Sequence, residues 1–111
     1  MAPELPATGR KYTLLFVDDE RRVLTSMRAM FRREYQVLLA NSGLEALALL
    51  REHKVDVIVS DQRMPGMTGI EVLKQVKVLA PNAMRILLTG YADLQAIEAS
   101  INEGEVFRYL T

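Results

Sequence analysis

The chain has 111 residues, of which 50% are hydrophobic and 25% are charged, a composition typical of one globular domain. Fourteen Lys and Arg residues balance fourteen Asp and Glu residues, so no net charge draws the chain to nucleic acid or to an anionic membrane. The lack of cysteine excludes disulfides and thiolate catalysis and is compatible with a reducing cytoplasm, where we expect the protein to act. No apolar run is long enough to span a bilayer.

Residues 1–10 contain Pro3, Pro6 and Gly9 but no apolar core, so they are predicted to form a loose leader before one domain at 11–111. Within that domain, short runs rich in Val, Ile, Leu and aromatic residues predict five strands. These runs are 12–17, 35–40, 55–60, 84–89 and 105–110.

Segments with helical spacing of apolar residues lie between the predicted strands. The first helix is expected from about Glu20, with its arginines mostly facing water. Ser42 with Glu45, and Thr68 with Glu71, have the spacing of a capping box and predict the starts of the second and third helices. The buried stripe of the first helix is predicted to be Val23, Leu24, Met27, Met30 and Phe31, and that of the fourth Leu94, Ile97 and Ile101.

This alternation of strands and helices predicts an α/β domain, a doubly wound parallel sheet with helices on both faces. In such sheets functional groups gather at the carboxyl ends of the strands. Asp18 and Asp19 follow the first strand, Asp61 follows or ends the third, and Thr89 ends the fourth. Three crowded carboxylates repel one another unless a cation neutralises them, and Mg²⁺ prefers such oxygen ligands together with a phosphate. Taken singly, each residue is also compatible with a helix cap, a turn or an ordinary strand position.

Three segments carry a family resemblance: LFVDDE at 15–20, VIVSDQRMPGMTG at 57–69 and ILLTG at 86–90. Together they resemble the signature of response regulator receiver domains from two-component signalling, and the resemblance spans 11–111. It implies a flavodoxin-like receiver fold whose five parallel strands have the order 2-1-3-4-5.

The resemblance implies that Asp18 and Asp19 hold Mg²⁺ and that Asp61 is both a metal ligand and the phosphoacceptor. The backbone carbonyl of Arg63 would complete the protein's share of the metal ligands. The donor would be a phosphohistidine on a sensor histidine kinase or phosphotransfer protein. The chain would then be a signalling domain that takes part in its own phosphorylation and dephosphorylation, and not an enzyme in the usual sense.

Thr89 corresponds to the family's switch hydroxyl and Tyr109 to its switch aromatic, although Tyr109 is also compatible with simple strand packing. In the family these groups remodel the surface around the fourth helix and fifth strand after phosphorylation, a two-state response to a local change in charge. That surface would control an output domain in the parent chain, as in receivers fused to cyclic-di-GMP phosphodiesterases or to ATP-dependent transcription activators.

The sequence departs from the family after the fifth strand, where a lysine, a proline and a fifth helix are expected. We therefore expect a receiver domain truncated after that strand; the alternative is a phosphate site that works without the lysine. Without the fifth helix one sheet face is uncovered, which would favour a homodimer.

Three alternatives remain open. A receiver-like module that never uses phosphate would not need the acidic set. A flavodoxin-like mononucleotide binder should carry hydroxyls and glycine after its first strand, where this chain has Asp18, Asp19 and Glu20. In a haloacid-dehalogenase-type phosphatase the nucleophile follows the first strand, with a second aspartate two residues on.

Overall fold

The computed structural model describes residues 10–90 and 108–110. The predicted leader up to residue 9 and the predicted fourth helix lie outside the described residues. No helix in the described part is both long and apolar enough to cross a membrane. The elements are β1 (Thr13–Val17), α1 (Arg21–Phe31), β2 (Gln36–Ala40), α2 (Gly43–Glu52), β3 (Val57–Asp61), α3 (Gly69–Leu79), β4 (Met84–Leu88) and β5 (Arg108–Leu110).

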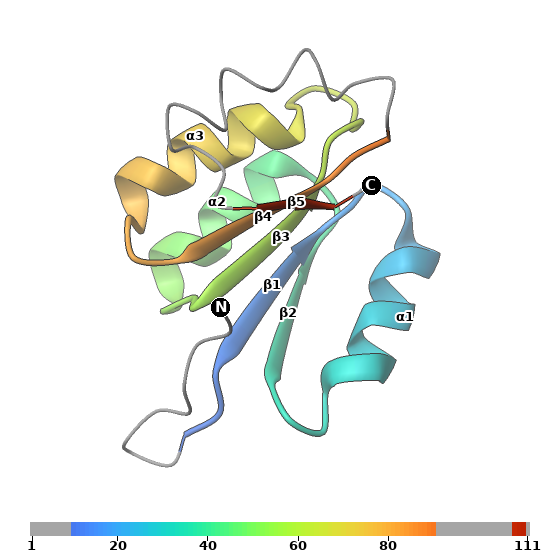
Figure 1. Cartoon of the computed structure of the whole chain (residues 1–111), viewed down its shortest axis with the longest axis vertical. Coiled ribbons are helices and arrows are strands. Elements are labelled where there is room, and N and C mark those ends of the chain that lie inside the picture. The colour runs from blue at the N-terminus through green and yellow to red at the C-terminus, as the bar shows by residue number, and fades with distance from the viewer. Residues whose placement is uncertain (1–9, 91–107, 111) are drawn as a thin grey trace.

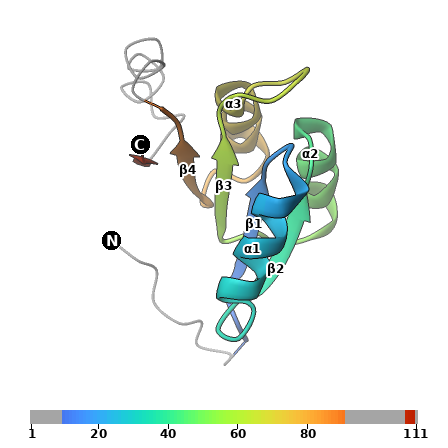
Figure 2. The same ribbon diagram turned by 90° about the vertical axis from the view of Figure 1, so that its right-hand side faces the viewer.

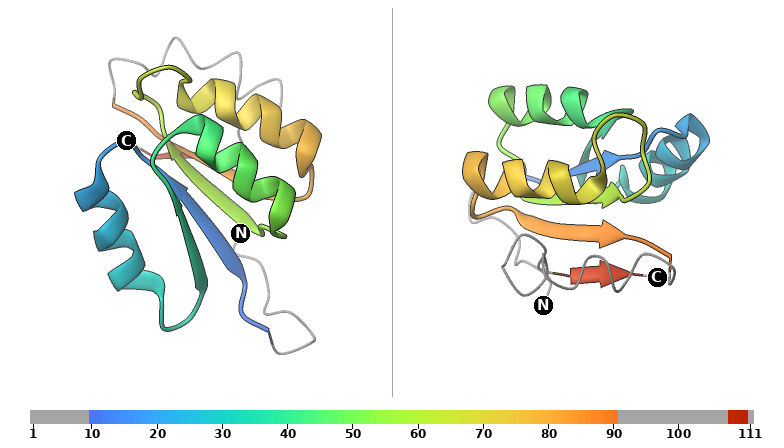
Figure 3. Two further views of the ribbon diagram at one scale, coloured as in Figure 1. Left: turned by 180° about the vertical axis from the view of Figure 1, so that it is seen from behind. Right: turned by 90° about the horizontal axis from the view of Figure 1, so that it is seen from above.

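The strands form one parallel sheet in the order β2-β1-β3-β4-β5, which confirms the predicted fold. Helix α1 lies on one face of the sheet, and α2 and α3 lie side by side on the other (Figures 1 and 2). Figure 3 shows the sheet from its other side and from above, with β4 and β5 beyond the part that α2 covers. A parallel sheet needs such helical crossovers, because consecutive parallel strands cannot be joined by a tight turn.

The central strand β1 explains why the apolar runs are nearly continuous. All five of its residues are buried, since helices cover both faces of the sheet. Leu15 and Val17 belong to the core beneath α2 and α3, whereas Leu14 and Phe16 belong to the core beneath α1. Alternate side chains of one strand thus contribute to two separate hydrophobic clusters.

Helix α1 matches its predicted stripe with one exception. Leu24 is buried and packs with the partly buried Met27 and Phe31, and Phe31 stacks on Phe16 with ring centroids 5.6 Å apart. The prediction for Met30 is wrong, because its side chain is 68% exposed. At about 100° per residue, Met30 lies about 120° around the helix from Leu24, so its side chain faces solvent and not the sheet. The arginines of α1 are exposed as predicted.

The predicted caps are found at the starts of α2 and α3. At α2 one of the two bonds of the predicted capping box is found, in which the Ser42 hydroxyl accepts a hydrogen bond from the Glu45 amide at 3.1 Å. Thr68 and Glu71 form a complete capping box, in which each side chain accepts from the other residue's backbone N–H. Gly66, in the turn before α3, has a φ of 81°, a backbone conformation that favours glycine.

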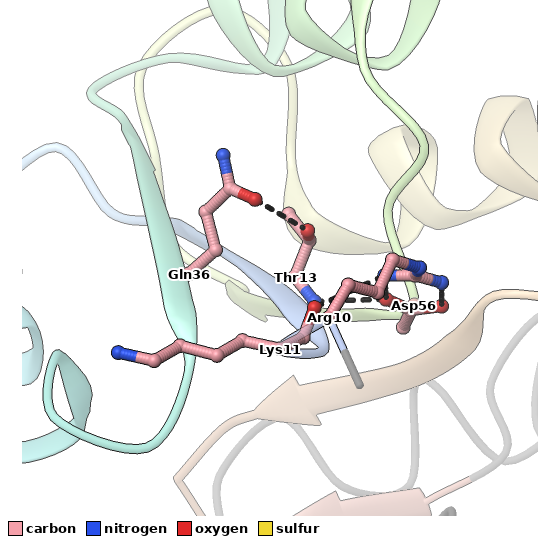
Figure 4. Close-up of polar contacts among 5 residues, drawn as sticks. All are labelled: Arg10, Lys11, Thr13, Gln36 and Asp56. Carbon is pink, nitrogen blue, oxygen red and sulfur yellow. Dashed lines mark hydrogen bonds and ion pairs between the residues drawn. The ribbon is translucent and has the colours of Figure 1, made fainter. Parts of the chain in front are cut away.

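Polar contacts tie the chain before β1 to the amino-terminal edge of the sheet (Figure 4). The Arg10 guanidinium pairs with the Asp56 carboxylate at 3.1 Å, and the same carboxylate accepts from the Thr13 amide at 2.8 Å. Burial alone would raise the pKa of Asp56, but the hydrogen bonds from Arg10 and Thr13 outweigh it and leave this pKa below its ordinary value. Arg10 therefore contacts the folded domain directly.

Candidate functional site

Four polar side chains lie at the carboxyl ends of the central strands. Asp18 and Asp19 directly follow β1, Asp61 is the last residue of β3, and Thr89 directly follows β4. The parallel registers of β1 with β3 and of β3 with β4 align these strand ends. Residues that are about 30 or 40 positions apart in the sequence are thereby brought to one edge, because parallel strands all end on the same side.

The three carboxylates form one compact group. A carboxylate oxygen from each of Asp18, Asp19 and Asp61 lies within 4.8 Å of the other two. Asp18 is only 9% exposed, Asp61 is partly buried and Asp19 is exposed. The Asp18 carboxylate also accepts a hydrogen bond from the Glu20 amide at 2.9 Å, which orders the turn between β1 and α1. The group therefore presents several oxygen donors around one point that solvent can reach.

Burial and repulsion by neighbouring carboxylates together raise the pKa of Asp61. Burial raises the pKa of Asp61, and the nearby Asp18 and Asp19 carboxylates raise it further, to about 6, although a hydrogen bond from the Gln62 backbone opposes them. Burial likewise raises the pKa of Asp18, against the hydrogen bond from Glu20. A hard cation bound among these oxygens would remove this repulsion, so the donor set fits a divalent metal ion such as Mg²⁺.

The other predicted site residues are Thr89, Arg63 and Tyr109. Thr89 is 8% exposed, and its hydroxyl donates to the Gly90 carbonyl at 3.4 Å. Arg63 is exposed beside a hollow of about 480 Å³ formed by the turn between β3 and α3. The backbone of Tyr109 pairs with Leu87 of β4, whereas its predicted role as a switch aromatic lies outside what the structure describes.

A comparison with protein families matches residues 14–111 to the response regulator receiver domain. The chain belongs to this family. The predicted family is thus confirmed over nearly the whole chain. The chain is a receiver domain of the kind found in two-component response regulators. Receiver domains are signalling domains.

Named relatives support the same family. The receiver domain is 43% identical over 103 residues to the hydrogenase transcriptional regulatory protein HoxA of Cupriavidus necator, covering 93% of this chain and 21% of HoxA. It is 34% identical to sporulation initiation phosphotransferase F of Bacillus subtilis, covering 86% of this chain and 78% of that protein. The response regulator protein TrrA of Thermotoga maritima, solved in complex with Mg²⁺-BeF, superimposes with a TM-score of 0.76 at 27% identity over 90% of this chain and 85% of TrrA. The chain spans about a fifth of the length of HoxA.

Two residues that position Asp61 in this receiver domain were not singled out from the sequence. A Cβ atom added to Gly69 would lie 2.3 Å from the Asp61 carbonyl oxygen, so only glycine lets α3 start this close to the end of β3. Gln62 binds the same helix start: its carbonyl accepts from the Gly69 amide at 3.1 Å, and its side-chain oxygen accepts from the Ile70 amide at 2.9 Å. Both residues lie in the segment 57–69 that carries the family resemblance, but nothing in their local pattern pointed to contacts with the start of α3.

Proposed function

We propose that Asp61 accepts a phosphoryl group from a phosphohistidine on a sensor histidine kinase or phosphotransfer protein. The cluster of Asp18, Asp19 and Asp61 at the strand ends of a receiver domain is the observation that carries this proposal. A reacting carboxylate must be accessible and ionised. Asp61 is partly exposed, and with a pKa of about 6 it is mostly ionised at neutral pH.

Mg²⁺ would be held by Asp18, Asp19, Asp61 and the backbone carbonyl of Arg63. When bound, it supplies positive charge that neutralises the oxygens of the incoming phosphoryl group. An ionised oxygen of Asp61 attacks the phosphorus atom in line with the phosphorus–nitrogen bond of the donor. That bond breaks, its electron pair returns to the imidazole ring, and Asp61 becomes an acyl phosphate. Gly69 lets the start of α3 lie against the Asp61 carbonyl, and the hydrogen bond from the Gly69 amide to the Gln62 carbonyl fixes the residue after Asp61 there.

The signal would pass from the acyl phosphate through Thr89 and Tyr109. The Thr89 hydroxyl, which donates to a neighbouring backbone carbonyl, would turn to donate to the phosphate oxygens. Tyr109 would respond as the switch aromatic and alter the surface that contacts an output domain in the parent protein. HoxA is named as a transcriptional regulator, which supports a receiver attached to a transcriptional output. We place the receiver unit at 11–111 and its action in the cytoplasm, as a phosphoacceptor and not a turnover enzyme.

Phosphorylation by a small donor tests this proposal directly. The protein is incubated with acetyl phosphate and Mg²⁺ and its intact mass is measured. We expect a gain of one phosphoryl group that disappears when Mg²⁺ is chelated or when Asp61→Asn is introduced. Asp56→Asn is the matched control. Asp56 lies just before the start of β3 and Asp61 at its end, so this variant should still be modified. A phosphate-independent interaction module would show no gain in any sample, and modification that persists in Asp61→Asn would exclude Asp61 as the acceptor.

A further inference from the structure

A second surface feature lies at the amino-terminal ends of the strands, and the carboxylate cluster lies at their carboxyl ends. It is a hollow of about 480 Å³ between the end of α1 and the start of β2, which we name the basic hollow. Both β1 and β2 begin beside it, whereas Asp61 stands where β3 ends. The residues that line the basic hollow are Lys11, Arg28, Arg32, Tyr35, Gln36 and Val37.

The basic hollow gathers three cationic side chains, and none of the described residues that line it is acidic. None of these three cations forms an ion pair with another described residue, whereas the neighbouring Arg10 pairs with Asp56. Lys11 donates to the Arg32 carbonyl at 3.5 Å, which keeps its ammonium group beside the end of α1. Arg28 lies in the last turn of α1 and Arg32 is the residue that caps its end, four positions on, so their like charges repel across a single turn. An anionic group in the hollow would relieve that repulsion.

The other lining residues shape the hollow. Tyr35 and Val37 lie on the face of the sheet that α1 covers. The Gln36 side chain alternates with theirs and lies on the other face, where its oxygen accepts from the Thr13 hydroxyl at 3.3 Å (Figure 4). The Tyr35 ring packs edge-on against Phe31 with centroids 6.1 Å apart, so it forms a firm wall of the hollow.

The strand that borders the basic hollow is an edge strand. In the described sheet β2 has β1 as its neighbour on one side, and its other side is the end of the strand order. An edge strand presents backbone N–H and C=O groups to which another extended chain can bind. Val37 and Leu39 of β2 are only partly buried, on the face of the sheet that α1 covers.

We propose that the basic hollow and the open edge of β2 bind an acidic polypeptide segment of a partner protein. Its carboxylates would contact Lys11, Arg28 and Arg32, and its backbone would lie along β2. A polypeptide is favoured over nucleic acid for two reasons. The formal net charge of the chain is zero, and three cations in one hollow are fewer than the roughly six to ten phosphate contacts of strong nucleic-acid binders. Since the hollow and Asp61 lie at opposite ends of the strands, the peptide can bind while Asp61 is phosphorylated.

Binding of a defined probe tests the proposal. A fluorescent peptide of alternating Glu and Val residues is titrated with the protein, and its anisotropy is measured at low and at physiological salt. The test variant is Arg28→Gln with Arg32→Gln. The matched control is Arg22→Gln with Arg33→Gln, which removes the same charge from exposed positions outside the lining of the hollow. Thermal melts establish that both variants are folded.

We expect the peptide to bind and the test variant to weaken binding about tenfold, as the loss of two modest ion pairs implies, with a change below about twofold in the control. Phosphorylation of Asp61 by acetyl phosphate should be the same in both variants, so failure at one site is distinguishable from failure at the other. Equal weakening by both variants, or no binding of the peptide, would overturn the proposal. Tighter binding of a single-stranded oligonucleotide than of the peptide would assign the hollow to nucleic acid instead.

Discussion

Replacing Asp61 by asparagine should make the metal-free protein more stable while removing its phosphoacceptor. Asp61 is held beside Asp18 and Asp19, and burial together with these carboxylates raises its pKa from 3.8 to about 6. A pKa that is higher in the folded than in the unfolded state means that ionising the group costs folding free energy. Asparagine has nearly the same shape and no charge, so it removes that cost.

The size of the effect follows from the pKa. A rise from 3.8 to about 6 corresponds to about 3 kcal/mol at 1.36 kcal/mol for each pH unit. Asp61 is only partly buried, and screening by solvent reduces this to about 1 to 2 kcal/mol. The penalty is fully present above about pH 6, shrinks as the pH falls towards 3.8, and is absent below that unfolded value. The variant should therefore gain most at neutral pH.

Urea unfolding of both proteins in a chelator, at pH 7.5 and near pH 4.5, measures the difference. The variant should be more stable at pH 7.5, with a smaller difference at the lower pH, and Mg²⁺ should stabilise the natural protein more than the variant. Asp56→Asn is the control of opposite sign: the pKa of Asp56 is lowered by its partners, so this substitution should cost about 1 kcal/mol at neutral pH. An Asp61→Asn variant that is equally or less stable at pH 7.5 would refute the reasoning.

Three further predictions concern the groups around Asp61. Gly69→Ala should lower the rate of phosphorylation at least tenfold, because its Cβ would collide with the Asp61 carbonyl. Gly90→Ala, whose added atom has no described neighbour within 4 Å, should leave stability unchanged in urea unfolding. Thr68→Ala should cost about 1 kcal/mol in the same assay by removing the cap of α3, and an unchanged midpoint would mean that the capping box does not stabilise this helix. Mg²⁺ affinity, measured by calorimetry, should fall as the pH drops below about 6, since protons then compete for Asp61; a pH-independent affinity would count against Asp61 as a ligand.

Local patterns were sufficient to predict most elements of the described fold. The apolar run of β1 and the capping pair of Thr68 and Glu71 depend on neighbours within a few residues, and both were found where they were expected. Met30 was misplaced because its exposure depends on how α1 sits on the sheet. The pairing of Arg10 with Asp56, 46 residues apart, was not anticipated, since no local rule selects one carboxylate among fourteen acidic residues.

The same division applies to the acidic site. By itself the sequence determined that Asp18, Asp19 and Asp61 lie at the ends of parallel strands, because the order of elements places all such ends on one edge. Only the tertiary structure decided how close the three carboxylates come, how far Asp61 is buried, and that α3 starts in contact with the Asp61 carbonyl over Gly69. Strand order and periodicity are properties of the chain, whereas distances and the pKa of a carboxyl group depend on which surfaces pack together.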